Sequence, residues 1–384
     1  KQFNLSPHPE GGWFREIVRS ENSLIREDGQ SRNLGWPIAW TFDPTFANFE
    51  VPIGIIFKFL GGFEICNNAK SRFLFDDKTF FYESSFSTEN QPCIGQIVKL
   101  KFRKKNQTGL ILKRHKKLKL NFTLLKVEEI FDGLIFKEEV MKSMIFLSNY
   151  SCSPLPLIFK QFMSGFDEKI KKIDQKFKIL DKPKTKINDE QNKALRKIKS
   201  INLECYNAIN LQGVTGSGKT RVYMKLVKKK LEKGFQCLIL VPEIILTKDW
   251  VNEIENDFGI RPYVFHSSEN KTKRAEIWKS VISGETLLII GTRSALFLPF
   301  TNLGFIVVDE EQDQSYKQED KLIFNTRDFA IVRAKNSNCP IILCSATPSI
   351  ETIYNSQINK FFKISLTKRI NERPLPKIEV VDMK

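Results

Sequence analysis

The loop at residues 213–220, GVTGSGKT, constrains the fold of this chain more than any other feature. It fits the pattern G-x-x-x-x-G-K-[ST], follows an apolar stretch and opens a segment of helical spacing that stops at Gly234. Glycines let backbone N–H groups turn inward around phosphate oxygens, and the helix N-terminus adds partial positive charge. The pattern therefore predicts a nucleotide site between a strand and a helix. A structural turn rich in glycine is the alternative.

In such a loop the lysine, here Lys219, reaches the β- and γ-phosphates, and the Thr220 hydroxyl ligates Mg²⁺. The motif N-K-x-D, which recognises guanine, occurs nowhere in the chain, and this argues against a G-protein-like switch. The residues expected to hold the nucleotide are Gly213, Thr215, Gly216, Ser217, Gly218, Lys219 and Thr220.

A second group of chemically active residues follows the apolar run at residues 305–308, which ends in the acids of the sequence DEEQ. Acids at the carboxyl end of a strand lie where doubly wound sheets bind ligands. Asp309 can hold Mg²⁺ there, and Glu310 can orient and deprotonate the attacking water. An acidic solvated loop is the alternative. Residues 345–347, SAT, close another apolar run and are weak evidence when taken alone.

The arrangement of apolar runs predicts two kinds of fold in one chain. From residue 187 on, short apolar runs alternate with helical spacing, which indicates a parallel α/β sheet with flanking helices. Upstream, residues 71–165 alternate apolar and polar side chains over short runs, which favours a small β-rich domain, with helical spacing at 138–150. Residues 166–186 are lysine-rich and are interpreted as a basic linker. The strand candidates of the α/β part are residues 205–211, 236–241, 286–290, 305–308 and 340–344.

Charge points to a polyanionic partner. The chain has 61 Lys and Arg against 44 Asp and Glu, a net charge of +17, which favours nucleic acid over membrane. Residues 99–126 hold eleven Lys or Arg and no acid, interleaved with apolar residues, which is the composition of a phosphate-binding surface. Three successive cations of this stretch, Arg103, Lys104 and Lys105, are expected to contact DNA. The alternative is the solvated face of a β-hairpin.

Two classes are excluded by composition. No run of about 18 apolar residues occurs, so a transmembrane helix is not expected. The seven cysteines are scattered without a C-x-x-C pair, which excludes an ordinary zinc module and indicates reduced, cytoplasmic thiols.

Taken in order, residues 213–220, 309–312 and 345–347 resemble motifs I, II and III of a superfamily 2 helicase. The sequences LVPEIILT (240–247), GTRSALFLPF (291–300) and VVDEEQDQSYKQED (307–320) closely resemble the primosomal protein N′ (PriA) family of replication-restart helicases. This resemblance covers residues 72 to 384.

The resemblance implies a RecA-like P-loop NTPase lobe at residues 187–384, preceded by a 3′-end DNA-binding domain at residues 71–165. It implies an ATP-dependent 3′-to-5′ DNA helicase that uses Mg²⁺, with Gln191 against adenine. DNA would be contacted by Arg293 and by an aromatic-rich loop, residues 316–329. Loader proteins and single-strand-binding protein are implied as partners. The DNA-contacting residues that the resemblance implies are Phe80, Lys126, Arg293, Tyr316, Phe324 and Arg327.

The sequence also departs from this family. Phe81 stands in place of an acid beside the pocket phenylalanine, and Gln312 replaces the histidine of a D-E-E-H box. The chain ends at Lys384, so it is interpreted as an N-terminal fragment without the second ATPase lobe and the zinc insertion, and by itself nearly inactive. Residues 1–32 resemble a cupin-like family of unknown function, and residues 1–70 are interpreted as a chimeric piece. A non-motor DNA-binding module with an ATP-binding switch is the alternative function.

Overall fold

The computed structural model describes residues 92–102, 105–114, 125–169, 187–285 and 287–370, and six short strands before residue 84. The chain divides into two compact units, Lys1–Pro52 and Ile53–Lys384. In the first unit, two antiparallel pairs are described. They are β1 (Ser6–Pro7) with β2 (Trp13–Phe14), and β3 (Ser23–Ile25) with β4 (Ser31–Asn33). The other residues of the cupin-like segment lie outside the described ones, and that interpretation stays a prediction.

The second unit begins with a five-stranded sheet in the order β5-β8-β7-β9-β6. Its central strand β7 runs antiparallel to β8 and β9, and its apolar side chains Ile97, Val98 and Leu100 are buried. The β-rich domain expected before the α/β part is therefore present. The strands are β5 (Ile55–Phe57), β6 (Tyr82–Glu83), β7 (Gln96–Phe102), β8 (Lys105–Ile111) and β9 (Leu125–Ile135).

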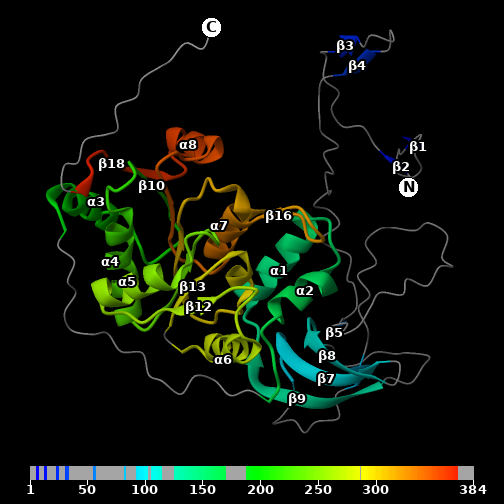
Figure 1. Ribbon diagram of the computed structural model, residues 1–384. Helices are drawn as coiled ribbons and strands as arrows, with labels where there is room; N and C mark the ends of the chain where they lie inside the picture. The colour runs from blue at the N-terminus through cyan, green and yellow to red at the C-terminus, as the bar shows by residue number, and fades with distance from the viewer. Residues whose placement is uncertain are drawn as a thin grey trace. The chain divides into compact units, whose positions relative to one another are not determined.

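Two helices follow, α1 (Glu138–Tyr150) and α2 (Leu155–Phe162), the first with the bounds that its spacing predicted. The rest of the unit is a sheet of seven parallel strands in the order β12-β13-β11-β14-β17-β10-β18 (Figure 1). The strands are β10 (Ala208–Gly213), β11 (Gln236–Leu240), β12 (Tyr263–Phe265), β13 (Leu288–Gly291), β14 (Leu303–Val308), β17 (Ile341–Ser345) and β18 (Phe362–Leu366).

Five of these strands were predicted, and two were not. The strand β12 has three residues, and β18 alternates exposed and buried side chains at the edge of the sheet, so neither has the continuous apolar run that marks a central parallel strand. The connecting helices are α3 (Asp189–Lys199), α4 (Lys219–Glu232), α5 (Lys248–Phe258), α6 (Lys271–Ile282), α7 (Thr326–Asn336) and α8 (Ile350–Gln357). Shorter elements are η3 (Arg293–Phe297), η4 (Gln314–Tyr316) and the hairpin of β15 (Lys317–Gln318) and β16 (Phe324–Asn325).

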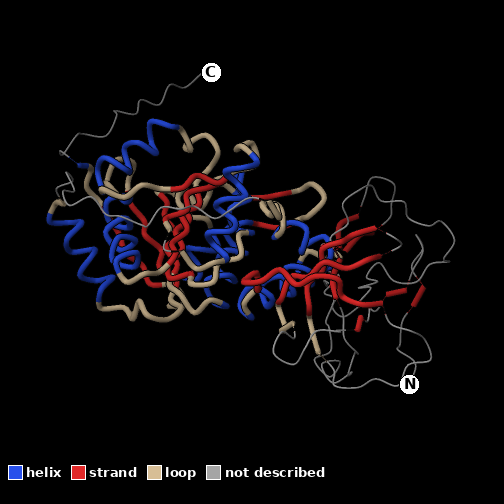
Figure 2. Tube along the Cα trace, turned by 90° about the horizontal axis from the view of Figure 1, so that it is seen from below, coloured by secondary structure: helices blue, strands red, loops and turns tan. Residues whose placement is uncertain are grey.

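Helices cover both faces of the parallel sheet (Figure 2). Side chains of alternate strand residues divide between two cores: one holds residues of α3, α4 and α5, and the other holds residues of α6, α7 and η3. Residues of α1, α2 and the five-stranded sheet belong to this second core. Within the described residues, no helix is both long and apolar enough to cross a membrane.

The β-rich sheet and the α/β sheet share that second core through aromatic contacts. The ring centroid of Phe136, just after β9, lies 6.4 Å from that of Trp278 on α6, and Phe162 meets Phe297 edge-on at 5.5 Å. The indole N–H of Trp278 donates to the carbonyl oxygen of Phe162 at 2.7 Å. On the α7 side, Arg333 is buried, and its guanidinium lies 5.3 Å from the Phe162 ring.

Candidate nucleotide site and its link to the DNA-facing loop

The phosphate loop lies between β10 and α4, at the carboxyl edge of the parallel sheet. Gly216 and Gly218 have φ angles of +78° and +79°, in the left-handed region that glycine adopts most readily. The Nζ atom of Lys219 donates to the carbonyl oxygen of Gly213 at 2.9 Å across the loop. The Ser217 hydroxyl is buried and has no hydrogen-bond partner among the described residues. The loop therefore holds a buried ammonium group and a spare hydroxyl in a turn shaped by glycine.

Gln191 lies against this loop, and its contact with adenine stays a prediction. The backbone N–H of Gln191 donates to the Asn188 side chain, and Oε1 of Gln191 accepts from the Asn188 backbone N–H. This capping box in the first turn of α3 fixes the position of Gln191. Its Nε2 atom donates to the carbonyl oxygen of Ser217 at 2.9 Å. A Cβ atom at Gly218 would collide with this amide, so the glycine lets Gln191 approach. Thr220 is half-buried on the first turn of α4, while Thr215 is exposed.

Asp309 and Glu310 follow β14 and stand at the same edge of the sheet. Asp309 is buried; it accepts a hydrogen bond from the Tyr223 hydroxyl at 2.9 Å and one from the Glu310 N–H at 3.1 Å. Burial raises the pKa of Asp309 to about 6, against the opposing effects of Tyr223 and Lys219. Glu310 has a φ of +46°, which turns the chain sharply after the strand. Because burial disfavours the ionised form of this carboxylate, a divalent cation beside it would stabilise that form.

The three sequence motifs come together because their strands are neighbours. The order β14-β17-β10 places the ends of the strands that carry the acids, the SAT sequence and the phosphate loop side by side. The Ser345 hydroxyl, at the end of β17, donates to Oε1 of Gln312 at 2.6 Å, and Nε2 of Gln312 donates to the Glu310 carboxylate at 2.9 Å. Gln312 thus joins the SAT residues to the expected water-activating acid by two hydrogen bonds.

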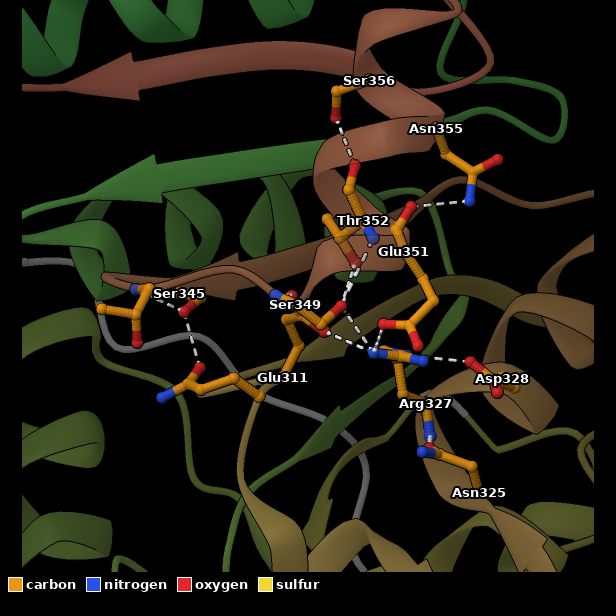
Figure 3. A network of polar contacts seen from close by, with 12 residues as sticks. Glu311, Asn325, Arg327, Asp328, Ser345, Ser349, Glu351, Thr352, Asn355 and Ser356 are labelled. Atoms are coloured by element: carbon orange, nitrogen blue, oxygen red, sulfur yellow. Dashed lines mark hydrogen bonds and ion pairs between the residues drawn. The ribbon is translucent and has the colours of Figure 1, made fainter. Parts of the chain in front are cut away.

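A second network leads from the acids to α7 and α8 (Figure 3). Nη1 of Arg327 lies 3.3 Å from Oε2 of Glu311 and donates to the Ser349 hydroxyl at 2.6 Å. The other Glu311 oxygen accepts from the Ser349 N–H at 2.8 Å. Asp328 and Glu351 also contact the guanidinium, but both are more exposed. Sequence reasoning missed Glu311 and Ser349 as site residues. Their signals were the third acid of DEEQ and the serine that caps the helix after SAT.

The aromatic residues of the expected DNA-facing loop lie inside the protein. Tyr316 is 1% exposed and donates its hydroxyl to the carbonyl oxygen of Asp309 at 2.7 Å; Phe324 packs edge-on against Phe297 and is 2% exposed. Both rings are therefore part of the core. In this conformation Tyr316 is not accessible to DNA, and its part in DNA binding stays a prediction. Arg293 is half-buried at the start of η3, and its Nη1 atom donates to the carbonyl oxygen of Lys317 on β15 at 3.3 Å.

The basic stretch at residues 99–126 is only partly described. Lys105 and Lys126 are exposed on β8 and β9. Phe80, Arg103 and Lys104 lie outside the described residues, and their DNA contacts stay predictions.

Acids from outside this stretch neutralise part of its charge. Lys99 is held by Glu129 at 3.2 Å and Glu168 at 3.4 Å, and Lys101 by Glu128 at 2.8 Å. The stretch itself contains no acid, but the antiparallel pairing of β7 with β9 brings Glu128 and Glu129 beside it.

Comparison with known families and proteins agrees with this geometry. The DEAD/DEAH box helicase family matches residues 165–356, and the family described as 3′DNA-binding domain (3′BD) matches residues 74–164. The described phosphate loop, both acids and the SAT residues all fall within the first match.

Curated relatives share the name replication restart protein PriA. The protein from Rickettsia prowazekii is 39% identical over 76% of this chain and 44% of its own length. The protein from Bacillus subtilis is 39% identical over 52% of this chain and 25% of its own length, and that from Haemophilus influenzae is 43% identical over 47% and 24%. The chain thus spans less than half the length of these relatives.

Proposed function

The chain belongs to the DEAD/DEAH box helicase family, and we propose from this premise that it is part of an ATP-dependent 3′-to-5′ DNA helicase of primosome assembly and replication restart. The observation that carries the proposal is the meeting of Lys219, Asp309 and Glu310 at one edge of the sheet, with a polar network leading away to Arg327. The curated relatives and the match to a 3′ DNA-binding domain support the choice of DNA and of replication restart.

The residues present fit Mg-ATP. The unpartnered, buried Ser217 hydroxyl and the raised pKa of Asp309 are both features that a bound phosphate and cation would relieve. Thr220 and Asp309 would hold Mg²⁺, which when bound neutralises charge on the phosphates. Lys219 would release the Gly213 carbonyl and turn to the phosphates, and Glu310, oriented by Gln312, would accept a proton from the attacking water.

DNA would lie against the β-rich domain, Arg293 at the start of η3 and Arg327 in the first turn of α7. Lys105 and Lys126 are among the exposed cations of the predicted phosphate-binding surface that the structure describes. The link from DNA to hydrolysis would run through Arg327, because its partner Glu311 follows directly after Glu310. Loader proteins and single-strand-binding protein as partners, and the cytoplasm as location, belong to this proposal.

The second candidate is a non-motor DNA-binding module in which ATP acts as a switch. Such a module would use the same nucleotide site as the motor, but DNA would not stimulate its ATP hydrolysis. Measuring ATP hydrolysis with and without single-stranded DNA separates the two. If the protein is a motor, single-stranded DNA should stimulate ATP hydrolysis by the wild type and not by Glu310→Gln. If it is a switch, ATP should change the affinity for DNA, and DNA should leave the hydrolysis rate unchanged.

Nucleotide binding is tested first, by titration with a fluorescent ATP analogue. Lys219→Ala is expected to weaken binding at least about tenfold, because it removes a charge-assisted phosphate contact. Lys229→Ala, on an exposed position of the same helix, is the matched control and should bind as the wild type does. Equal affinities for wild type and Lys219→Ala would remove the basis of the nucleotide site.

A further inference from the structure

Helix α1 carries a stacked aromatic pair on its solvent side. The rings of Phe146 and Tyr150 lie 5.6 Å apart at 16°, and the two residues are 38% and 54% exposed. They are four residues apart on one helical stripe, which Lys142 continues by one turn. Ile145 beside them is also exposed. Large apolar side chains gathered on one exposed helix face mark a binding surface more often than single ones do.

The position of the pair is fixed by the packing of α1 on α7 (Figure 1). Near the middle of α1, the Ser143 hydroxyl accepts a hydrogen bond from the side-chain amide of Asn336 at the end of α7. At the other end of α1, the pKa of Tyr150 is raised, first by partial burial and then by the charge of Asp328, while Arg327 acts against it. The helices thus run antiparallel, and Tyr150 stands beside the start of α7, where Arg327 lies.

The aromatic side chains of the loop at residues 316–329 are buried in the core, so the exposed pair near Arg327 is the accessible aromatic surface there. Tyr316 and Phe324 are buried, so neither offers a face to a base in this conformation. The pair on α1 supplies accessible aromatic surface next to the same arginine.

We propose that Phe146 and Tyr150 form a stacking platform for an unpaired base of single-stranded DNA, with Lys142 available to an adjacent phosphate. An exposed, nearly parallel aromatic pair offers a flat face on which a base can continue the stack, and every base has such a face. Lys142 is bound to Glu138 at 2.8 Å, but this ion pair is exposed on both sides and so contributes little. The chain's net charge of +17 favours the polyanion over an apolar protein partner. The inference rests on the proposed DNA-binding function and adds residues to it.

The test compares the affinity for a short oligothymidylate, followed by fluorescence anisotropy, across four proteins. Phe146→Ala/Tyr150→Ala removes the platform, and Phe146→Tyr/Tyr150→Phe keeps two rings. Tyr354→Ala/Phe362→Ala is the matched control, because it removes two aromatic residues of similar exposure from α8 and β18. Circular dichroism melts of all four proteins establish that each one is folded.

The platform variant is expected to bind about tenfold more weakly than the wild type, since stacking of one base corresponds to about that factor. The salt dependence of binding should keep its slope, because no phosphate contact is removed. The ring-keeping variant and the control should bind like the wild type. An oligonucleotide carrying 2-aminopurine should lose its stacking-induced quenching only in the platform variant.

If the wild type binds DNA and the platform variant binds equally well, the inference is wrong and the proposed function stands. A platform variant that loses no more affinity than the control pair overturns it in the same way. If the wild type binds no DNA, the proposed function itself fails, and the inference with it.

Discussion

Replacing Asp309 with asparagine is expected to stabilise the nucleotide-free protein at neutral pH. Asp309 is buried, and within the described residues its carboxylate has two hydrogen-bond donors, the Tyr223 hydroxyl and the Glu310 N–H. Asparagine keeps the shape and can keep both contacts, with its oxygen toward the N–H and its amino group toward the hydroxyl. Apart from the reversed hydrogen bond with Tyr223, only the negative charge is removed, so the change reports mainly the cost of burying that charge.

The pKa of Asp309 gives the size of this effect. It rises from 3.8 to about 6 on folding, because burial disfavours the charged form. An acid with a raised pKa binds its proton more tightly in the folded state, so ionisation destabilises the fold as pH rises above the unfolded value. The cost should be about 3 kcal/mol at about pH 7.5, where both states are ionised, and about 1.5 kcal/mol at about pH 5. The variant should exceed the wild type in stability by these amounts.

Urea unfolding without Mg²⁺ or nucleotide, followed by circular dichroism at both pH values, measures the two free energies. Asp249→Asn, at an exposed position of α5, serves as the control and should leave a pH-independent difference near zero. Adding Mg-ATP should raise the melting temperature of the wild type and leave that of Asp309→Asn unchanged. A gap between wild type and variant that does not widen with pH, or a less stable variant at neutral pH, would refute the buried-charge argument.

Two further outcomes are expected. Glu311→Gln leaves the buried guanidinium of Arg327 without its most buried charged partner. This variant should therefore lose about 3 kcal/mol of stability in thermal melts, and DNA should no longer stimulate its ATP hydrolysis. The control Glu351→Gln, which changes an exposed partner of Arg327, should have little effect on either quantity. Unchanged coupling in Glu311→Gln would exclude this route. Lys105→Glu should reduce the slope of log affinity against log salt by about 0.7–0.9, the value for one phosphate, and an unchanged slope would move the DNA surface elsewhere.

Local spacing was sufficient to predict which residues meet at the candidate nucleotide site, because the phosphate loop and the two acids each directly follow the end of a strand. The parallel sheet then joins them, since neighbouring strands end at one edge. The contacts of Arg327 with Glu311 and Ser349 could not be predicted, because they span 16 and 22 residues and depend on how α7 and α8 pack. The same holds for Tyr316, whose burial is decided by the core beneath it.

Charge and aromatic surfaces were the least predictable features. The cations at residues 99–126 have no acid among them in the sequence, but strand pairing brings Glu128 and Glu129 into ion pairs with Lys101 and Lys99. The pair Phe146 and Tyr150 has the spacing of a buried helix stripe, and only the orientation of α1 on α7 leaves it exposed.

The aromatic cluster between the two sheets determines which parts of the protein can exist separately. The rings of Phe136 and Phe159 pack edge to face at 6.0 Å. Phe136 also contacts Phe162 and Trp278, which extend the cluster into the interior of the α/β part. A cut after residue 165 would therefore pass through an interior and leave two apolar surfaces open to solvent, a condition that promotes aggregation. The five-stranded sheet and the parallel sheet therefore share one core. Exchanging either sheet for its counterpart from another protein would therefore require new aromatic side chains that match those of the sheet that remains.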